Sequence, residues 1–233
     1  MWPQLLTLDL GGVDIVVGTD DDQLAETLAP WRTSGADIDP SVIDFSAQLH
    51  PPRPSQRSGL RQIPVVHHGT VVLGRSTDTD ELRTALLRVL GSLTAEVPEG
   101  CVRLTGVPLL RDGTVELASL QWAADGSRAL RRRGYEPMYA GNVIIDPVAL
   151  TVRIPEPLAV SSSRAAERVV PFVGWWSDLP EAEPRHPFGQ VVAMTVSRSI
   201  AMAPEPRLTS SQLAALVALV DRLPPRPASD LTR

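Results

Sequence analysis

The sequence predicts an α/β or α+β fold in which mixed β-sheets carry a few amphipathic helices. Hydrophobic residues make up 43% of the 233 residues and charged residues 21%, the balance of a chain that can bury a real core. Short apolar stretches bounded by glycine or proline are typical of strands. Two longer segments with apolar residues three and four positions apart are typical of helices with one buried face.

The first half, residues 1–96, is expected to form a small α+β domain. Strands at Leu5–Leu10 and Val13–Val17 flank Gly11-Gly12, a pattern typical of a hairpin. Three aspartates then precede a short helix predicted over Gln23–Trp31, because carboxylates favour the positive end of a helix. Alternation predicts a further strand over Val42–Leu49.

A second hairpin and the clearest helix of the chain follow. Ile63–Val66 and Thr70–Leu73 are predicted strands around Gly69. A helix is predicted over Thr77–Leu93, where Thr77 with Asp80 resembles a capping box. Its apolar residues fall on one face: Leu82, Ala85, Leu86, Val89, Leu90 and Leu93.

The second half, residues 97–225, begins within a polar linker at Thr94–Gly100. A short helix is predicted over Ser127–Arg133 and a final one from Thr209 to Pro224, with residues 226–233 as a flexible tail. A Pro-rich stretch, Leu179–Pro187, separates the last two predicted strands. The strands predicted in this half are Val102–Leu104, Val107–Leu110, Thr114–Ala118, Asn142–Asp146, Leu150–Ile154, Val169–Val173 and Gln190–Ser197.

Composition excludes several kinds of chemistry. All 22 basic residues are arginine, so neither a phosphate-loop lysine nor a Schiff-base lysine is present. The single cysteine excludes an internal disulfide and a multi-cysteine metal site. A net charge of -5 argues against a general nucleic-acid-binding protein. Met1-Trp2-Pro3 opens directly into an alternating stretch, without a targeting segment or a long apolar run. We therefore expect a cytoplasmic protein with no membrane partner.

The order of short segments in the second half resembles the HPr kinase/phosphorylase-like proteins, which have a phosphoenolpyruvate-carboxykinase-like fold. The likeness covers roughly Gly100–Pro157. It rests on Val102-Arg103-Leu104, Arg111-Asp112-Gly113, Thr114–Ala118, Arg131-Arg132-Arg133-Gly134-Tyr135, Asn142–Asp146, Pro147, Leu150 and Pro155. The hairpin–helix pattern of the first half also resembles the small N-terminal domain of such proteins.

The departures from this family remove its phosphate chemistry. The family's histidine falls on Thr105, and its metal-binding acidic pair falls on Ala140-Gly141. Its glycine-rich phosphate loop falls on Ser119–Ser127, which has one glycine and no lysine, and Leu120 and Trp122 do not suit a phosphate cradle. The resemblance therefore implies a catalytically inactive relative that needs no cofactor.

Other candidate catalytic or metal-binding residues are better explained structurally. His67 and His68 are adjacent on a strand and point to opposite faces, which disfavours a shared metal ion. Cys101 lacks a local nucleophile signature and is expected to be buried. Asp20–Asp22 are expected to cap a helix. The sequence thus predicts no catalytic residue and no metal.

Three features remain as candidate binding surfaces. The first is the strand edge formed by Thr70, Val71, Val72 and Leu73, to which an extended peptide could add beside the amphipathic helix. The second is a basic cluster suited to acidic partners: Arg128, Arg131, Arg132 and Arg133. The third is the pair Trp175-Trp176, in which one ring is expected in the core and the other as a surface anchor.

These features predict a non-enzymatic binding or scaffold protein that recognises a precursor (leader) peptide or a partner enzyme in a bacterial peptide-modification pathway. The hairpin and helix are similar in architecture to the winged-helix domains that bind leader peptides. One alternative is a nucleotide-binding pseudokinase that holds phosphate with Arg128 and Arg131–Arg133. Another is an enzyme with a site around Asp112, Asp125, Tyr135 and Tyr139, and a third is a structural subunit of a partner enzyme. The oligomeric state stays open.

Overall fold

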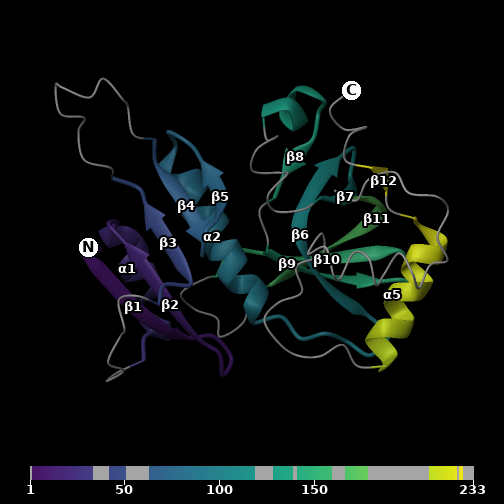
Figure 1. Cartoon of the computed structure of the whole chain (residues 1–233), viewed down its shortest axis with the longest axis horizontal. Coiled ribbons are helices and arrows are strands. Elements are labelled where there is room, and N and C mark those ends of the chain that lie inside the picture. Colours follow the sequence, from purple (N-terminus) through teal and green to yellow (C-terminus); the bar gives the residue numbers. More distant parts are fainter. Residues whose placement is uncertain are drawn as a thin grey trace.

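The computed structural model describes residues 2–33, 42–50, 63–118, 128–138, 141–158, 166–177, 210–224 and 226–227. Figure 1 shows two sheets that lie side by side with helix α2 (Thr79–Leu93) between them. Most strand pairs are antiparallel and the helices pack on the sheets, so the mixed fold that the sequence predicts is confirmed in its α+β form.

The first sheet has five strands in chain order, and only the β2–β3 pair is parallel. Consecutive hairpins account for this order, because β1 joins β2 through Gly11-Gly12 and β4 joins β5 through a turn at Gly69. Among the described residues, β5 has no strand partner on its outer side. The strands are β1 (Gln4–Asp9), β2 (Asp14–Thr19), β3 (Phe45–Gln48), β4 (Val65–His68) and β5 (Val71–Arg75).

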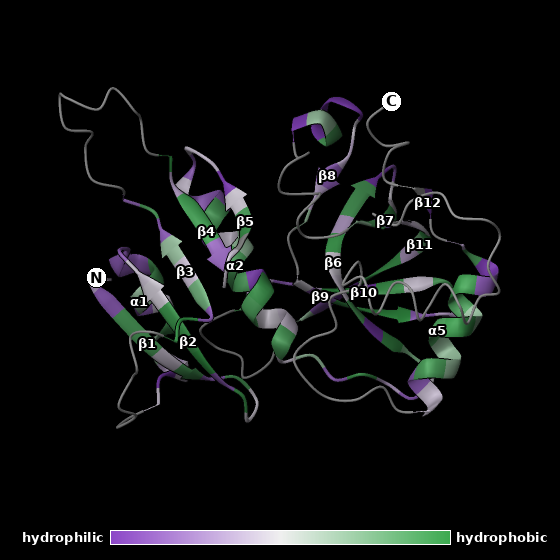
Figure 2. Ribbon diagram, in the orientation of Figure 1, coloured by the Kyte–Doolittle hydropathy of each residue, from purple (hydrophilic) through white to green (hydrophobic). Residues whose placement is uncertain are grey.

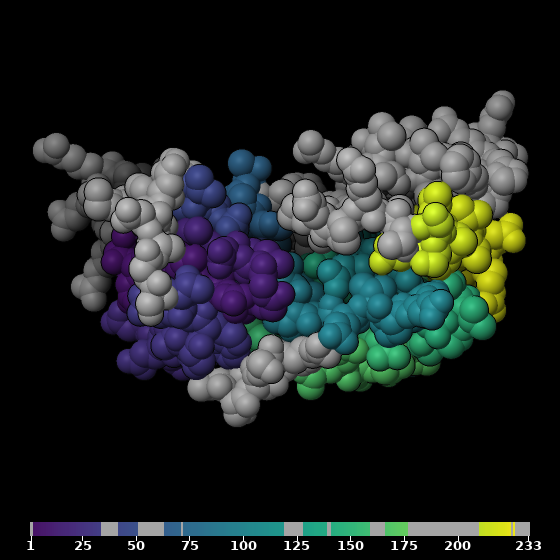
Figure 3. All heavy atoms as spheres, turned by 90° about the horizontal axis from the view of Figure 1, so that it is seen from below, coloured from purple at the N-terminus to yellow at the C-terminus, as the bar shows by residue number. Residues whose placement is uncertain are grey.

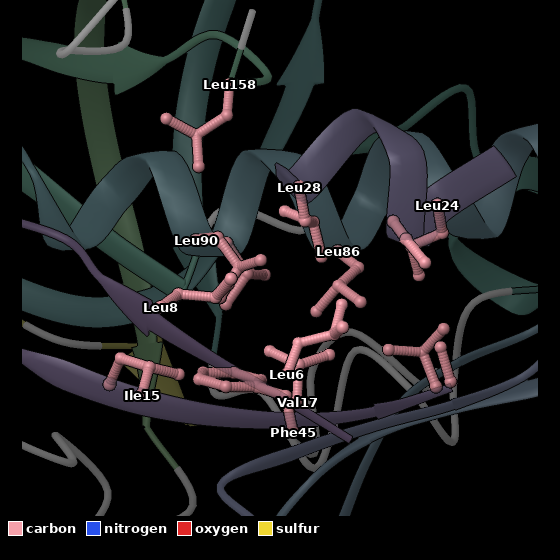
Figure 4. Close-up of a cluster of buried hydrophobic side chains, with 14 of the residues drawn as sticks. Leu6, Leu8, Ile15, Val17, Leu24, Leu28, Phe45, Leu86, Leu90 and Leu158 are labelled. Atoms are coloured by element: carbon pink, nitrogen blue, oxygen red, sulfur yellow. The ribbon is translucent and has the colours of Figure 1, made fainter. Parts of the chain in front are cut away.

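Two helices cover one face of this sheet and bury its alternating apolar residues (Figure 4). Helix α1 (Asp22–Leu28) is shorter than predicted, because Pro30 lies in a 3₁₀ turn at Ala29–Trp31. Helix α2 starts two residues later than predicted. Its N-cap is Asp78, whose carboxylate accepts hydrogen bonds from the N–H groups of Asp80 and Glu81.

The second sheet closes on itself, because β10 pairs with both β9 and β11. The two strands predicted at Val102–Leu104 and Val107–Leu110 are one continuous strand, β6. The strands are β6 (Val102–Arg111), β7 (Thr114–Ala118), β8 (Glu136–Pro137), β9 (Gly141–Asp146), β10 (Thr151–Pro155), β11 (Glu167–Ser177) and β12 (Arg226–Pro227).

Side-chain alternation gives the closed sheet an inner and an outer core. Inward residues such as Leu104, Val143 and Phe172 form one cluster with the apolar face of α5 (Ser210–Arg222). Outward residues such as Val107 and Leu109 pack against α2 and a short helix at 128–132. Hydrophobic residues accordingly follow the strands and both long helices in Figure 2.

Helix α2 belongs to the cores of both sheets. Leu86 and Leu90 pack on the first sheet, whereas Ser92 accepts a hydrogen bond from the backbone N–H of Asn142 in β9, at 3.1 Å. Leu158, which follows β10, packs in the first core and donates its N–H to the carbonyl of Leu87. The two halves therefore share α2, and Figure 3 shows them packed together.

Near the C-terminus, the structure corrects one prediction, and two others lie outside the described residues. Arg226 and Pro227 were expected in a flexible tail, but they pair in parallel with Trp176 and Ser177 as β12. The predicted strand Gln190–Ser197 and the stretch Leu179–Pro187 lie outside the described residues. Within the described ranges, no helix is long and apolar enough to cross a membrane.

Candidate functional site

A cleft of about 550 Å³ lies between the end of β5, the start of α2 and the short helix at 128–132. Three elements from both halves of the chain line it. The lining residues are Gly74, Arg75 and Ser76 after the β5 edge, Glu81, Leu82 and Ala85 of α2, and Arg128, Arg131 and Arg132 of the short helix. The structure thus places the end of the predicted β5 edge beside the arginine cluster, but Thr70, Val71, Val72 and Leu73 themselves are not among the residues that line the cleft.

The strand wall of the cleft offers the exposed Arg75 side chain and the backbone of β5. Leu73 is 1% exposed and points into the first core, so its side chain is unavailable to a partner. Gly74 is buried, and a Cβ there would stand 3.2 Å from Leu82. Val72 is half-buried and Thr70 is exposed in the turn. A ligand on this wall would therefore meet the Arg75 side chain as well as backbone N–H and C=O groups of an edge strand.

The arginine wall follows from the geometry of one helical turn. Positions 128, 131 and 132 are three and four residues apart, so they share a helix face, whereas Arg133 lies off it. Leu130, 1% exposed, anchors the opposite side of this helix in the outer core. Gly134, with a φ of 80°, ends the helix in the left-handed conformation.

The cleft is positively charged on a chain whose net charge is -5. Four arginines and one glutamate line it. Glu81 pairs with Arg131 and also accepts a hydrogen bond from the Ser76 hydroxyl, at 2.8 Å. Among the described residues, neither Arg128 nor Arg132 has an ion pair, and both line the cleft, so their guanidinium donors are available to a ligand there.

The floor between these walls is apolar. Leu82 is 2% exposed and Ala85 is 5% exposed, and both lie on α2. An apolar floor beside arginines suits an amphipathic chain with acidic groups on one side. The only carboxylate of the described lining, that of Glu81, meets both the Arg131 guanidinium and the Ser76 hydroxyl.

The two tryptophans do not form an exposed anchor. Trp175 is 2% exposed in the inner core and donates its indole N–H to the carbonyl of Leu223, at 2.5 Å. Trp176 is half-buried and donates to Glu116 at 2.7 Å, and its ring lies under the Arg226 guanidinium. Trp175 is therefore the ring expected in the core and is unavailable to a partner, whereas Trp176, expected as a surface anchor, is half-buried with its indole N–H and ring face used within the fold.

Glu116 is the centre of a buried polar cluster that the sequence analysis missed. Its carboxylate, on the outer face of β7, accepts hydrogen bonds from Tyr135 at 2.9 Å and Trp176, and pairs with Arg226 at 2.7 Å. Burial raises the pKa of the Glu116 carboxyl, but hydrogen bonds from Arg226, Trp176 and Tyr135 outweigh burial and hold the pKa below its ordinary value. The cluster fixes β12 and the residues after the short helix.

Asp21 is the centre of a similar buried polar cluster in the first half. It caps α1 through the N–H of Leu24 at 2.6 Å, as expected of this aspartate run. It also receives two hydrogen bonds from Arg83 on α2, at 3.0 and 2.7 Å, and one from His50 at 2.8 Å. Each donor is satisfied within the fold, so the cluster positions α1 against α2.

The remaining candidates offer no catalytic arrangement. His68 stacks on Phe45 with ring centroids 4.4 Å apart, and His67 points to the opposite face, toward Ser46. Cys101 is buried, and burial raises its thiol pKa. No group of three potential metal ligands occurs among the described residues.

The alternative enzyme site is not assembled by the described residues. Asp112 is 93% exposed at a turn, whereas Tyr135 is buried against Glu116. Asp125, Tyr139 and the phosphate-loop position 119–127 lie outside the described residues. Thr105, where the family histidine falls, donates a hydrogen bond to Asn142 at 2.9 Å.

Comparison with known proteins adds no functional assignment. No protein-family model, curated protein or solved structure matches the chain.

Proposed function

We propose that this chain is a non-enzymatic peptide-binding protein that holds an acidic precursor (leader) peptide for the enzymes of a bacterial peptide-modification pathway, in the cytoplasm. One observation carries the proposal. The cleft joins the C-terminal end of β5, a strand with no partner on its outer side among the described residues, to an arginine wall. An edge strand binds extended peptides through their backbone, and arginines select acidic side chains.

The two walls divide the work of recognition. Backbone hydrogen bonds to β5 would supply affinity without regard to sequence. Arg128 and Arg132 would supply selectivity, because a partly exposed ion pair contributes about 0.2–1 kcal/mol and opposite charge also speeds association. A site of this kind binds and orients a peptide, and chemistry is left to the partner enzyme.

The first test measures binding of fluorescein-labelled, twelve-residue peptides by anisotropy at physiological ionic strength. One peptide has a Thr/Val-rich, strand-forming sequence with glutamates, and a matched peptide has glutamines instead. We expect the glutamate peptide to bind and Arg128→Glu/Arg132→Glu to weaken it by at least about tenfold. Arg168→Glu/Arg32→Glu makes the same charge change at two exposed positions outside the cleft and should leave binding nearly unchanged.

Backbone pairing is tested by changing the peptide, so that the protein keeps its fold. Alternate amides of an extended peptide point to opposite sides. We therefore expect N-methylation in one alternating frame to abolish binding and in the other to leave it largely intact. Equal losses in both frames, or equal losses in both double charge variants, would refute strand addition at this cleft.

Two further measurements on the same purified protein distinguish peptide binding from the alternative functions. A thermal shift with ATP and magnesium ions, without peptide binding, would favour a nucleotide-binding pseudokinase instead. Tighter binding of a labelled single-stranded DNA than of any acidic peptide would make the arginine wall a nucleic-acid site and would overturn the proposal.

A further inference from the structure

The arginine wall presents two available guanidinium groups at a fixed spacing. Arg128 and Arg132 lie one helical turn apart on the short helix that lines the cleft. Four residues of α-helix rise about 6 Å. Arg131 lies beside them on the same helix, and its charge is already met by Glu81.

An extended peptide carries its own fixed spacing. Side chains two residues apart lie on the same face of a strand and are separated by about 6.6 Å, whereas neighbouring side chains point to opposite faces. Side chains four apart share a face but are separated by about 13 Å. Only the separation of two matches one helical turn closely.

We infer that the peptide recognised by this cleft carries two acidic residues two positions apart, one for Arg128 and one for Arg132. This inference rests on the proposed function, since it assumes an extended peptide on the β5 edge. Glu81 has a defined part in it, because by pairing with Arg131 it leaves Arg128 and Arg132 as the two arginines of this helix face that have no ion pair among the described residues.

The intervening residue of the peptide is also constrained. Its side chain points away from the arginine wall when its two neighbours point toward it. The residues before and after the acidic pair that share its face extend over the cleft floor formed by Leu82 and Ala85, where the buried surface is apolar. The motif is therefore an acidic pair within an otherwise apolar face.

The experiment varies only the separation of two glutamates in one twelve-residue Thr/Val-rich host peptide. Separations of one, two, three and four residues are compared by anisotropy, at equal net charge. We expect the separation of two to bind about three- to fivefold more tightly than the others, the value of one additional ion pair. Arg132→Gln should remove this preference, whereas Arg168→Gln should keep it.

The possible failures are distinct. If all four glutamate peptides bind with equal affinity, or if the preference persists in Arg132→Gln, the spacing inference is wrong while peptide binding stands. If none of the four peptides binds, the proposed function fails first. Circular dichroism spectra matching the wild type would show that both exposed arginine variants retain the fold.

Discussion

Replacing Asp21 by asparagine tests how α1 and α2 are held together. The carboxylate is 1% exposed and receives four hydrogen bonds, from Leu24, twice from Arg83 and from His50. Asparagine keeps an oxygen for the N-cap but removes the charge that Arg83 faces. The substitution therefore isolates the ion pair from the cap.

The size of the effect follows from what remains around Arg83. Removing one partner of a buried pair costs about 3–5 kcal/mol. Arg83 is 14% exposed and also pairs with Asp80, so its charge is not left alone. We therefore expect Asp21→Asn to lower the free energy of unfolding by about 2–3 kcal/mol, and Asp21→Ala by about 1 kcal/mol more through the lost cap.

Urea denaturation at pH 7, followed by circular dichroism, measures both losses. Asp80→Asn is the matched control, because Asp80 meets the same guanidinium but is 82% exposed. We expect that control to change the stability by less than about 0.5 kcal/mol. A loss below about 1 kcal/mol for Asp21→Asn, or an equal loss for both asparagine variants, would refute this reasoning.

The other predictions concern the second sheet and acid stability. Glu116→Gln weakens the hydrogen bonds to the buried carboxylate and leaves Arg226, which is 44% exposed, without its partner; we expect urea unfolding to show a loss of about 1–2 kcal/mol, and an unchanged midpoint would contradict the structural role of Glu116. The pKa values of Asp21 and Glu116 are held low against burial, mainly by hydrogen bonds from Arg83 and Arg226. The stability that these two carboxylates contribute is therefore present above the ordinary carboxyl pKa and is lost as pH falls through the folded pKa values. Unfolding midpoints should drop below about pH 4, and they should drop less in Glu116→Gln. Gly106→Ala should cost about 1–3 kcal/mol in thermal unfolding, because its Cβ would stand 2.8 Å from a backbone carbonyl of β7. Gly174→Ala should cost less, since the nearest atom, at 2.5 Å, is the end of the Arg226 side chain, and equal costs would argue against this packing.

Local patterns predicted the elements better than their ends. The apolar period of α2 identified the helix and its buried face, but the sequence pointed to Thr77 as the cap, and only the observed hydrogen bonds identify Asp78. Gly106 and Pro108 interrupt the alternation of β6 and suggested two strands. Pairing with β9, β7 and β8 holds the segment as one strand, which is a tertiary effect.

The site could be predicted only in parts. The arginine cluster and the β5 edge are visible in the sequence, but Glu81 and Arg131, which bring their walls together, are 50 residues apart. Trp175 and Trp176 looked equivalent as neighbours. Alternation along β11 places Trp175 in the inner core and Trp176 on the outer face, toward Glu116. A register shift between Phe172 and Gly174 determines which of the two tryptophans points inward.

Helix α2 explains why the cleft can serve as a preformed site. It packs on the first sheet through Leu86 and Leu90 and is tied to β9 through Ser92, so one rigid element sets the distance between β5 and the short helix. A peptide entering the cleft need not order two independent halves, which lowers the entropic cost of binding. The same argument predicts that substitutions loosening α2, far from any peptide contact, weaken binding by raising that cost.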